Sequence, residues 1–166
     1  MLHIRIGSDY HYATERAEMA ELIAMVLRGG PVNASTAFSF ADRRHTAETR
    51  DWWLDNVLQV GVNPATGYGG LTWHVTPARA DRSGDAKDAY CWVTDNPDPP
   101  ETDPVVLSDP GAPVCYDRRS TLPIADIRAA LEEFCRSGTG DRPQSVRWVR
   151  GDLNGERLDE RQAPRW

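Results

Sequence analysis

The fold of this chain is decided by the stretch Val57-Leu-Gln-Val-Gly-Val-Asn-Pro-Ala-Thr-Gly-Tyr-Gly-Gly-Leu-Thr-Trp73. Its first half is rich in β-branched residues, and its second half places Leu71 and Trp73 two positions apart, so both halves predict strands with one apolar face. Between them, Asn63, Pro64 and three glycines supply the fixed and positive φ angles that a turn needs. The stretch therefore predicts a β-hairpin.

A glycine-rich turn can also cradle a phosphate group. Such a site needs a helix after the turn, whose amide N–H groups bind the anion, and usually a lysine as well. Here a predicted strand follows the turn, and the single lysine of the chain is Lys87. The hairpin is therefore the better interpretation.

The rest of the chain predicts two helices and four more strands. Apolar residues recur three and four positions apart from Thr14 to Gly29 and from Pro123 to Gly138, which is typical of amphipathic helices. Alternating apolar residues predict strands at residues 2–6, 35–41, 89–94 and 145–149. Strands joined by short turns favour an antiparallel sheet, and amphipathic helices need a sheet face to cover. We therefore expect an α+β fold with a mainly antiparallel sheet covered by two helices.

The segments between these elements are predicted to be irregular. Residues 43–53 fit either a loop or a short helical turn, and residues 79–88 are polar. Residues 95–113 hold six of the 12 prolines, which argues against regular structure there. Residues 151–166 are charged and are expected to form a flexible tail.

Length and composition indicate one domain. A chain of 166 residues can fill one hydrophobic core but not two of ordinary size. No apolar run reaches the roughly 18 residues that a membrane-spanning helix needs, and the first residues lack the basic and apolar segments of a secretory signal. We therefore expect a single domain over residues 1–166 that is cytoplasmic and does not bind a membrane.

Local signatures of catalysis and metal binding are missing from the sequence. The three cysteines lack CxxC spacing, and the four histidines form neither HExxH nor an i, i+4 pair. There is no GxSxG motif either. We therefore predict no catalytic residue, no metal site and no cofactor. Two alternatives stay open, namely a small enzyme of unrecognised type that uses His74 with a carboxylate, and a small-ligand-binding module on a tryptophan-lined sheet face.

Charge is unevenly distributed along the chain, whose net charge is −6. Between Lys87 and Arg118 there is no basic residue, and seven carboxylates lie there: Asp88, Asp95, Asp98, Glu101, Asp103, Asp109 and Asp117. This run is either a solvated loop or a surface that steers a basic partner. The acidic balance argues against direct binding to nucleic acid.

The partner-binding residues that we predict come from this run and from the hairpin. Asp95, Asp98, Glu101 and Asp103 are the predicted steering carboxylates. Tyr68, which we place at the tip of the glycine-rich turn, is the predicted aromatic anchor, because tyrosine often anchors protein interfaces.

Ordered blocks of the sequence resemble the Immunity protein 1 family. They cover roughly residues 50–150 and are Asn56–Trp73, Asn96-Pro97, Leu122–Phe134, Gly140–Pro143 and Val146–Trp148. Within them Asn63, Pro64, Gly67 and Trp73 are better interpreted as fold determinants than as contact residues. Residues 1–50 match less clearly, which leaves open that they set specificity.

The resemblance implies a bacterial antidote protein. Members of that family are small α+β proteins of polymorphic toxin systems that bind a cognate toxin domain, often a nucleic-acid deaminase, and block it. The resemblance therefore implies a non-enzymatic inhibitor that forms a 1:1 complex with its toxin and occludes the active site. An acidic inhibitor could occupy a basic substrate groove as a mimic of nucleic acid.

Overall fold

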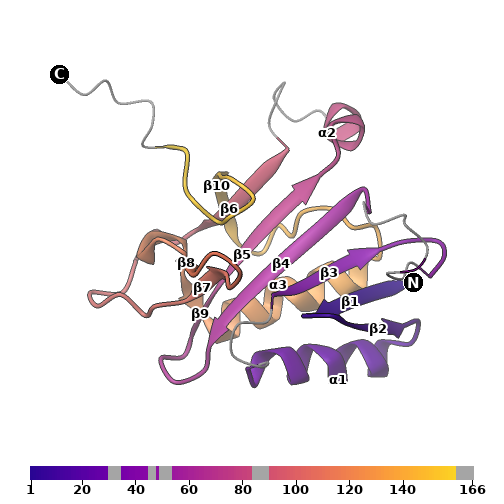
Figure 1. The fold of residues 1–166 in the computed structure, drawn as a ribbon, viewed down its shortest axis with the longest axis horizontal. Coiled ribbons are helices and arrows are strands. Elements are labelled where there is room, and N and C mark those ends of the chain that lie inside the picture. Colours follow the sequence, from indigo (N-terminus) through magenta and orange to yellow (C-terminus); the bar gives the residue numbers. More distant parts are fainter. Residues whose placement is uncertain (30–34, 45–47, 49–53, 84–89, 160–166) are drawn as a thin grey trace.

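The computed structural model describes residues 1–29, 35–44, 48, 54–83 and 90–159. At its centre lies one eight-stranded sheet in the order β10-β6-β5-β4-β3-β1-β2, with β9 paired to β5 (Figure 1). All of these strand pairs are antiparallel. The strands of this sheet are β1 (Leu2–Ile6), β2 (Asp9–Ala13), β3 (Thr36–Phe40), β4 (Asn56–Asn63), β5 (Tyr68–Val75), β6 (Cys91–Asp95), β9 (Leu122–Pro123) and β10 (Arg147–Arg150).

The predicted hairpin is confirmed as β4 and β5, the two longest strands. Their register runs from Asn56 opposite Val75 to Asn63 opposite Tyr68. The turn is tighter than the sequence predicted, because β5 already begins at Tyr68. Of the three glycines, Gly67 supplies the positive φ, at 77°, and the other two lie within β5.

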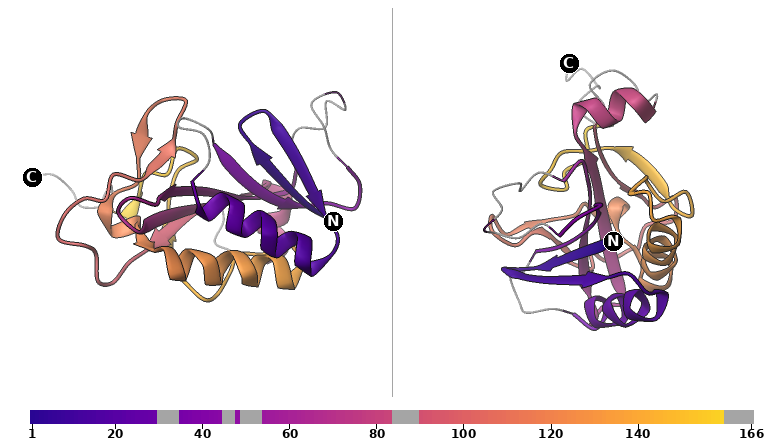
Figure 2. Two further views of the ribbon diagram at one scale, coloured as in Figure 1. Left: turned by 90° about the horizontal axis from the view of Figure 1, so that it is seen from below. Right: turned by 90° about the vertical axis from the view of Figure 1, so that its right-hand side faces the viewer.

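Two helices pack together on one face of the sheet, α1 (Arg16–Leu27) and α3 (Ile124–Ser137) (Figure 2). Between helices and sheet lies a core that includes Ile23, Leu58, Trp73, Ile127 and Phe134, all at most 2% exposed. Gly138 ends α3 in the left-handed conformation, with φ of 66°. The α+β class and the two covering helices are therefore confirmed.

The second face of the sheet carries a smaller layer. A hairpin of β7 (Leu107–Asp109) and β8 (Val114–Cys115) lies over β4 and β5 there. Tyr116 follows β8 and is buried with Val93 and Val106 in a second apolar cluster. A Cβ atom on Gly70 would lie 2.6 Å from the Tyr116 ring, so glycine at this position lets the tyrosine approach the strand.

Several elements differ from the sequence prediction. Helix α2 (Pro77–Ser83) occupies part of the predicted loop at 79–88, and it begins with a proline, which suits the first turn of a helix. Strands β2 and β9 were not predicted. The expectation of no regular structure at 95–113 is wrong for Leu107–Asp109, where the chain is free of proline and can pair with β8. Of the ambiguous segment 43–53, most lies outside the described residues.

Residues 151–159, which the sequence places in a charged tail, fold back on the domain. Gly151 forms a bridge with Arg157, and the Leu158 amide donates to the carbonyl of Arg150 at 2.9 Å. Residues 160–166 lie outside the described part of the chain.

Candidate partner-binding site

The candidate site is the acidic loop, which we define as residues 96–106 between β6 and β7. It carries the exposed carboxylates Asp98, Glu101 and Asp103. The loop lies beside the β4–β5 turn at one end of the sheet (Figure 1). The proline-rich sequence therefore forms a projection next to the tip of the central hairpin.

The first half of the acidic loop is anchored by Asn96 and Arg118. The backbone N–H of Asn96 donates to the Arg119 carbonyl at 2.7 Å, and its side-chain amide donates to the Thr121 carbonyl at 2.7 Å. Its side-chain oxygen accepts from the Asp98 amide at 2.9 Å. The Arg118 guanidinium donates to the Pro100 carbonyl at 2.9 Å. The first half of the loop is thus attached to residues 118–121, and the bond from the Asn96 side chain is buried.

The second half is anchored to the hairpin. The Asn63 side-chain amide donates to the Pro104 carbonyl at 2.9 Å, and the Asp103 carboxylate accepts from the Val105 amide at 2.8 Å. Val105 itself is 59% exposed and has a φ of 51°. A β-branched residue rarely adopts this conformation, which costs about 1–3 kcal/mol and persists where neighbouring contacts impose it. Here Pro104 and Val106 are buried on either side.

The structure places three of the five predicted site residues on one surface. Asp98, Glu101 and Asp103 are exposed together on the acidic loop. Asp95 is the last residue of β6, its side chain is 17% exposed, and its carboxylate forms ion pairs with Arg157 at 3.0 Å and Arg147 at 3.5 Å.

Tyr68 lies in a strand and not at the tip of the turn, where the sequence analysis placed it. It is the first residue of β5, pairs with Asn63 and Pro123, and is half-buried. Its side chain packs against the cluster of Val93, Val106 and Tyr116. Tyr68 therefore lies at the base of the projection that the acidic loop forms.

Sequence reasoning did not find Arg157. Its side chain is 6% exposed and donates to the carboxylates of Asp95 at 3.0 Å and Asp159 at 2.6 Å, and to the Arg119 carbonyl at 3.1 Å. Burial alone would lower the pKa of Arg157, but the two carboxylates hold it above its usual value. The hydrogen bonds from Arg157 in turn lower the pKa of Asp159. No local pattern marks this arginine, since Asp95 is 62 positions away.

A model of the family described as Immunity protein Imm1 matches residues 7–150. The chain belongs to this family. As an Imm1 immunity protein it binds and neutralises a cognate toxin. The match includes every element from β2 to β10, and hence the acidic loop and both covering helices. Searches of curated proteins and of solved structures found no match.

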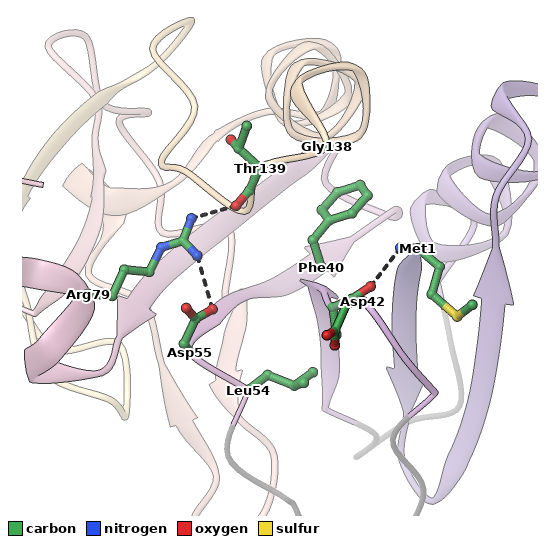
Figure 3. Close-up of a pocket in the computed structure, with 9 residues that line it drawn as sticks. Met1, Phe40, Asp42, Leu54, Asp55, Arg79, Gly138 and Thr139 are labelled. Carbon is green, nitrogen blue, oxygen red and sulfur yellow. Dashed lines mark hydrogen bonds and ion pairs between the residues drawn. The ribbon is translucent and has the colours of Figure 1, made fainter. Parts of the chain in front are cut away.

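A cavity of about 530 Å³ lies at the opposite end of β4 from the acidic loop of this Imm1 protein (Figure 3). Its wall includes Phe40, Asp55 and Arg79. The Arg79 guanidinium already bridges the carboxylates of Asp55 at 3.0 Å and Asp141 at 2.9 Å. The amino group of Met1 already donates to the Ala41 carbonyl at 2.7 Å. These cations join α2 and β1 to their neighbours, which is a structural role.

The enzyme alternative centred on His74 finds little chemical support in this Imm1 protein. Burial lowers the pKa of His74 to about 4, and its Nδ1 atom is buried with no hydrogen-bond partner in the described residues. Cys91 lies opposite His74 in β6, and burial, reinforced by Asp152, raises the pKa of its thiol to about 12. At pH 7 both side chains are therefore uncharged, so His74 is a poor proton acceptor and Cys91 a poor nucleophile.

Metal sites and membrane-spanning helices were looked for in all the residues that the structure of the Imm1 chain describes. Residues 1–29, 35–44, 48, 54–83 and 90–159 include no group of three or more histidines, cysteines or carboxylates placed to hold a metal ion. In the same residues, the helices are too short or too polar to cross a membrane.

Proposed function

We propose that this Imm1 protein neutralises a toxin that acts on nucleic acid, such as a deaminase, by placing its acidic loop in the substrate groove of the toxin. A groove that holds a phosphate backbone is lined with basic side chains. Three exposed carboxylates on one anchored loop provide the complementary charge. This projection of Asp98, Glu101 and Asp103 is the observation that carries the proposal.

The attachment of the loop to the rest of the domain supports the same function. Hydrogen bonds from Asn63, Asn96 and Arg118 order the loop in the free protein. A partner then loses less conformational entropy on binding, which favours affinity. The 59% exposed side chain of Val105 adds an apolar contact among the charges.

Tyr68 and Asp95 have supporting places in this proposal. The exposed part of Tyr68 borders the loop at the start of β5, where it would act as an anchor at the rim of the interface. Asp95 adds negative charge beneath the loop, although Arg147 and Arg157 screen it. The complex is proposed to be 1:1, to form in the cytoplasm, and to bury an interface of about 1,600 Å² in total.

The experiment that tests this function uses the toxin domain encoded by the adjacent open reading frame. The association rate constant is measured for the wild-type chain and for the triple variant Asp98→Asn, Glu101→Gln, Asp103→Asn over a range of salt concentrations. We expect the triple variant to associate about tenfold more slowly at low salt and to show a flatter salt dependence. Inhibition of deamination of a single-stranded oligonucleotide should weaken in parallel.

A matched control removes the same charge elsewhere. The variant Asp9→Asn, Glu21→Gln, Glu132→Gln neutralises three exposed carboxylates on β2, α1 and α3, and it should keep wild-type association within about twofold. If both triple variants behave alike, net charge and not the acidic loop governs binding. A toxin that binds tightly but shows no activity on nucleic acid would refute the proposed target class.

A further inference from the structure

The C-terminal segment that follows β10 is attached to the acidic loop. We call residues 151–159 the strap. It begins where the Imm1 match ends, and the Gly151 amide ties its start to the Cys91 carbonyl at 3.1 Å. It then turns through a bond from the Asp152 amide to the Glu156 carbonyl at 2.9 Å and returns alongside β10 (Figure 1).

The strap contacts the first stem of the acidic loop through Arg157. Its guanidinium bonds to Asp95, which precedes the loop, and to the Arg119 carbonyl. That same carbonyl accepts from the Asn96 amide at 2.7 Å. The buried Arg157 side chain therefore binds the residue before the loop and also η1 (Arg118–Ser120), which packs against β6. Through the shared Arg119 carbonyl it is linked to Asn96, the first residue of the loop.

A second contact lies at the far end of the loop, where it enters β7. The Ser108 hydroxyl donates to the Asn154 carbonyl at 2.6 Å, and its oxygen also lies 3.1 Å from the Val114 carbonyl oxygen. Gly155 follows with a φ of 86°, and a Cβ atom there would lie 2.4 Å from the Ser108 side chain. The strap thus touches the structure on both sides of residues 96–106.

We propose that the strap is a positioning element that holds the acidic loop in the conformation that meets the toxin, with Arg157 as its main contact. This inference rests on the function proposed above. Without Arg157, Asp95 keeps the exposed Arg147 as its ion-pair partner among the described residues, and the Arg119 carbonyl loses a donor. The loop would then populate its binding conformation for a smaller fraction of the time, and apparent affinity falls by that fraction.

The first measurement needs no toxin. Amide hydrogen exchange is compared between the wild-type chain and Arg157→Gln, with Arg147→Gln as the control that removes the same charge from the same carboxylate. In Arg157→Gln we expect the amides of Asn96, Asp98 and Val105 to exchange about tenfold faster or more, with the amides of α3 unchanged. In Arg147→Gln these rates should stay within about twofold, since Arg147 makes only a 3.5 Å contact from an exposed position.

The second measurement is association with the toxin domain. If the strap positions the loop, Arg157→Gln lowers the association rate constant and leaves the dissociation rate constant near wild type, because only the population of the competent loop changes. In the background of the neutralised triple variant, the same substitution should then have a much smaller effect. Arg157→Lys, which keeps the charge but lacks the planar fork of N–H donors of the guanidinium, should lie between wild type and Arg157→Gln.

Several outcomes would overturn the inference. The first is that Arg157→Gln leaves the exchange rates of the loop amides unchanged. The second is that these amides exchange faster while the association rate constant stays at the wild-type value. The third is that Arg157→Gln lowers the association rate constant equally in the wild-type chain and in the neutralised triple variant. Should Arg157→Gln fail to fold, Arg157→Lys is used for all three comparisons. If the wild-type chain does not bind the toxin, the proposed function fails, while the exchange comparison still decides whether the strap orders the loop.

Discussion

The hydroxyl of Tyr116 lies 2.9 Å from the hydroxyl of Thr72, and both side chains are buried. This bond connects the segment that follows β8 to the middle of β5, on the face of the sheet opposite the helices. It fixes the base of the layer from which the acidic loop projects, because Tyr116 also packs against Val106 at the end of that loop.

Removal of this hydroxyl should destabilise the protein. Tyr116→Phe leaves the buried Thr72 hydroxyl without a partner, so we expect the free energy of unfolding to fall by about 1–3 kcal/mol. Adding Thr72→Val, which removes the hydroxyl that lost its partner, should recover part of that loss in stability. Urea unfolding of the two single variants and the double variant measures the coupling, and additive losses would show that the two hydroxyls do not interact.

Gly70→Ala should be more damaging than its small size suggests. The new methyl group would lie 2.6 Å from the Tyr116 ring. Because Tyr116 is buried, neighbouring side chains leave its ring little room to move away. Overpacking of this kind costs about 1–3 kcal/mol. Gly111→Ala is the control, since its methyl group meets only a flexible carboxylate at 3.3 Å. Thermal unfolding should show a clear drop for the first variant and a small change for the second.

The parts of the fold that sequence could predict are those specified by neighbours in the chain. The β4–β5 hairpin follows from alternation and a turn sequence, and the two large helices follow from apolar residues three and four positions apart. Helix α2 has seven residues and one buried apolar side chain, Ala80, so its sequence shows no comparable spacing of apolar residues. Strand β7 is stabilised by pairing with β8 and by contacts to β4. The proline-rich sequence around β7 does not predict these contacts.

The candidate site shows the same division. The exposure of Asp98, Glu101 and Asp103 follows from charge and proline content alone. The ion pair of Asp95 with Arg157 joins residues 62 positions apart, and only the folded chain brings them together. A run of carboxylates therefore indicates the surface, but it does not indicate which member of the run is held by internal cations.

Burial of His74 should make stability depend on pH. Its pKa is about 4 in the folded protein because burial disfavours the charged form, against an ordinary value near 6.5 in the unfolded chain. Between these values the unfolded chain binds more protons, so the contribution of His74 is fully present above about pH 6.5 and decreases as pH falls toward 4, by up to about 1.4 kcal/mol per pH unit. Urea unfolding at pH 7, 6 and 5 should show this slope.

His74→Gln should flatten that slope, because glutamine does not titrate. His11→Gln, at a half-exposed position in β2, is the matched control for the exchange of a histidine for a glutamine. Equal slopes in all three proteins would mean that the pH dependence arises from other groups.

Asn63→Asp should release the acidic loop from the hairpin while leaving the hairpin turn intact. The Asn63 side-chain oxygen accepts from the Ala65 amide at 3.2 Å, and an aspartate oxygen can do the same. The side-chain amide, which donates to Pro104, would be replaced by a second oxygen that faces carbonyl oxygens. We expect a loss of about 1–2 kcal/mol in stability and a slower association with the toxin. Thr66→Val, which removes a 3.3 Å contact to the same carbonyl and a 3.2 Å contact within the turn to the Asn63 carbonyl, should have a smaller effect on both. If Asn63→Asp lowers stability and leaves the association rate constant unchanged, the order of the loop does not contribute to toxin recognition.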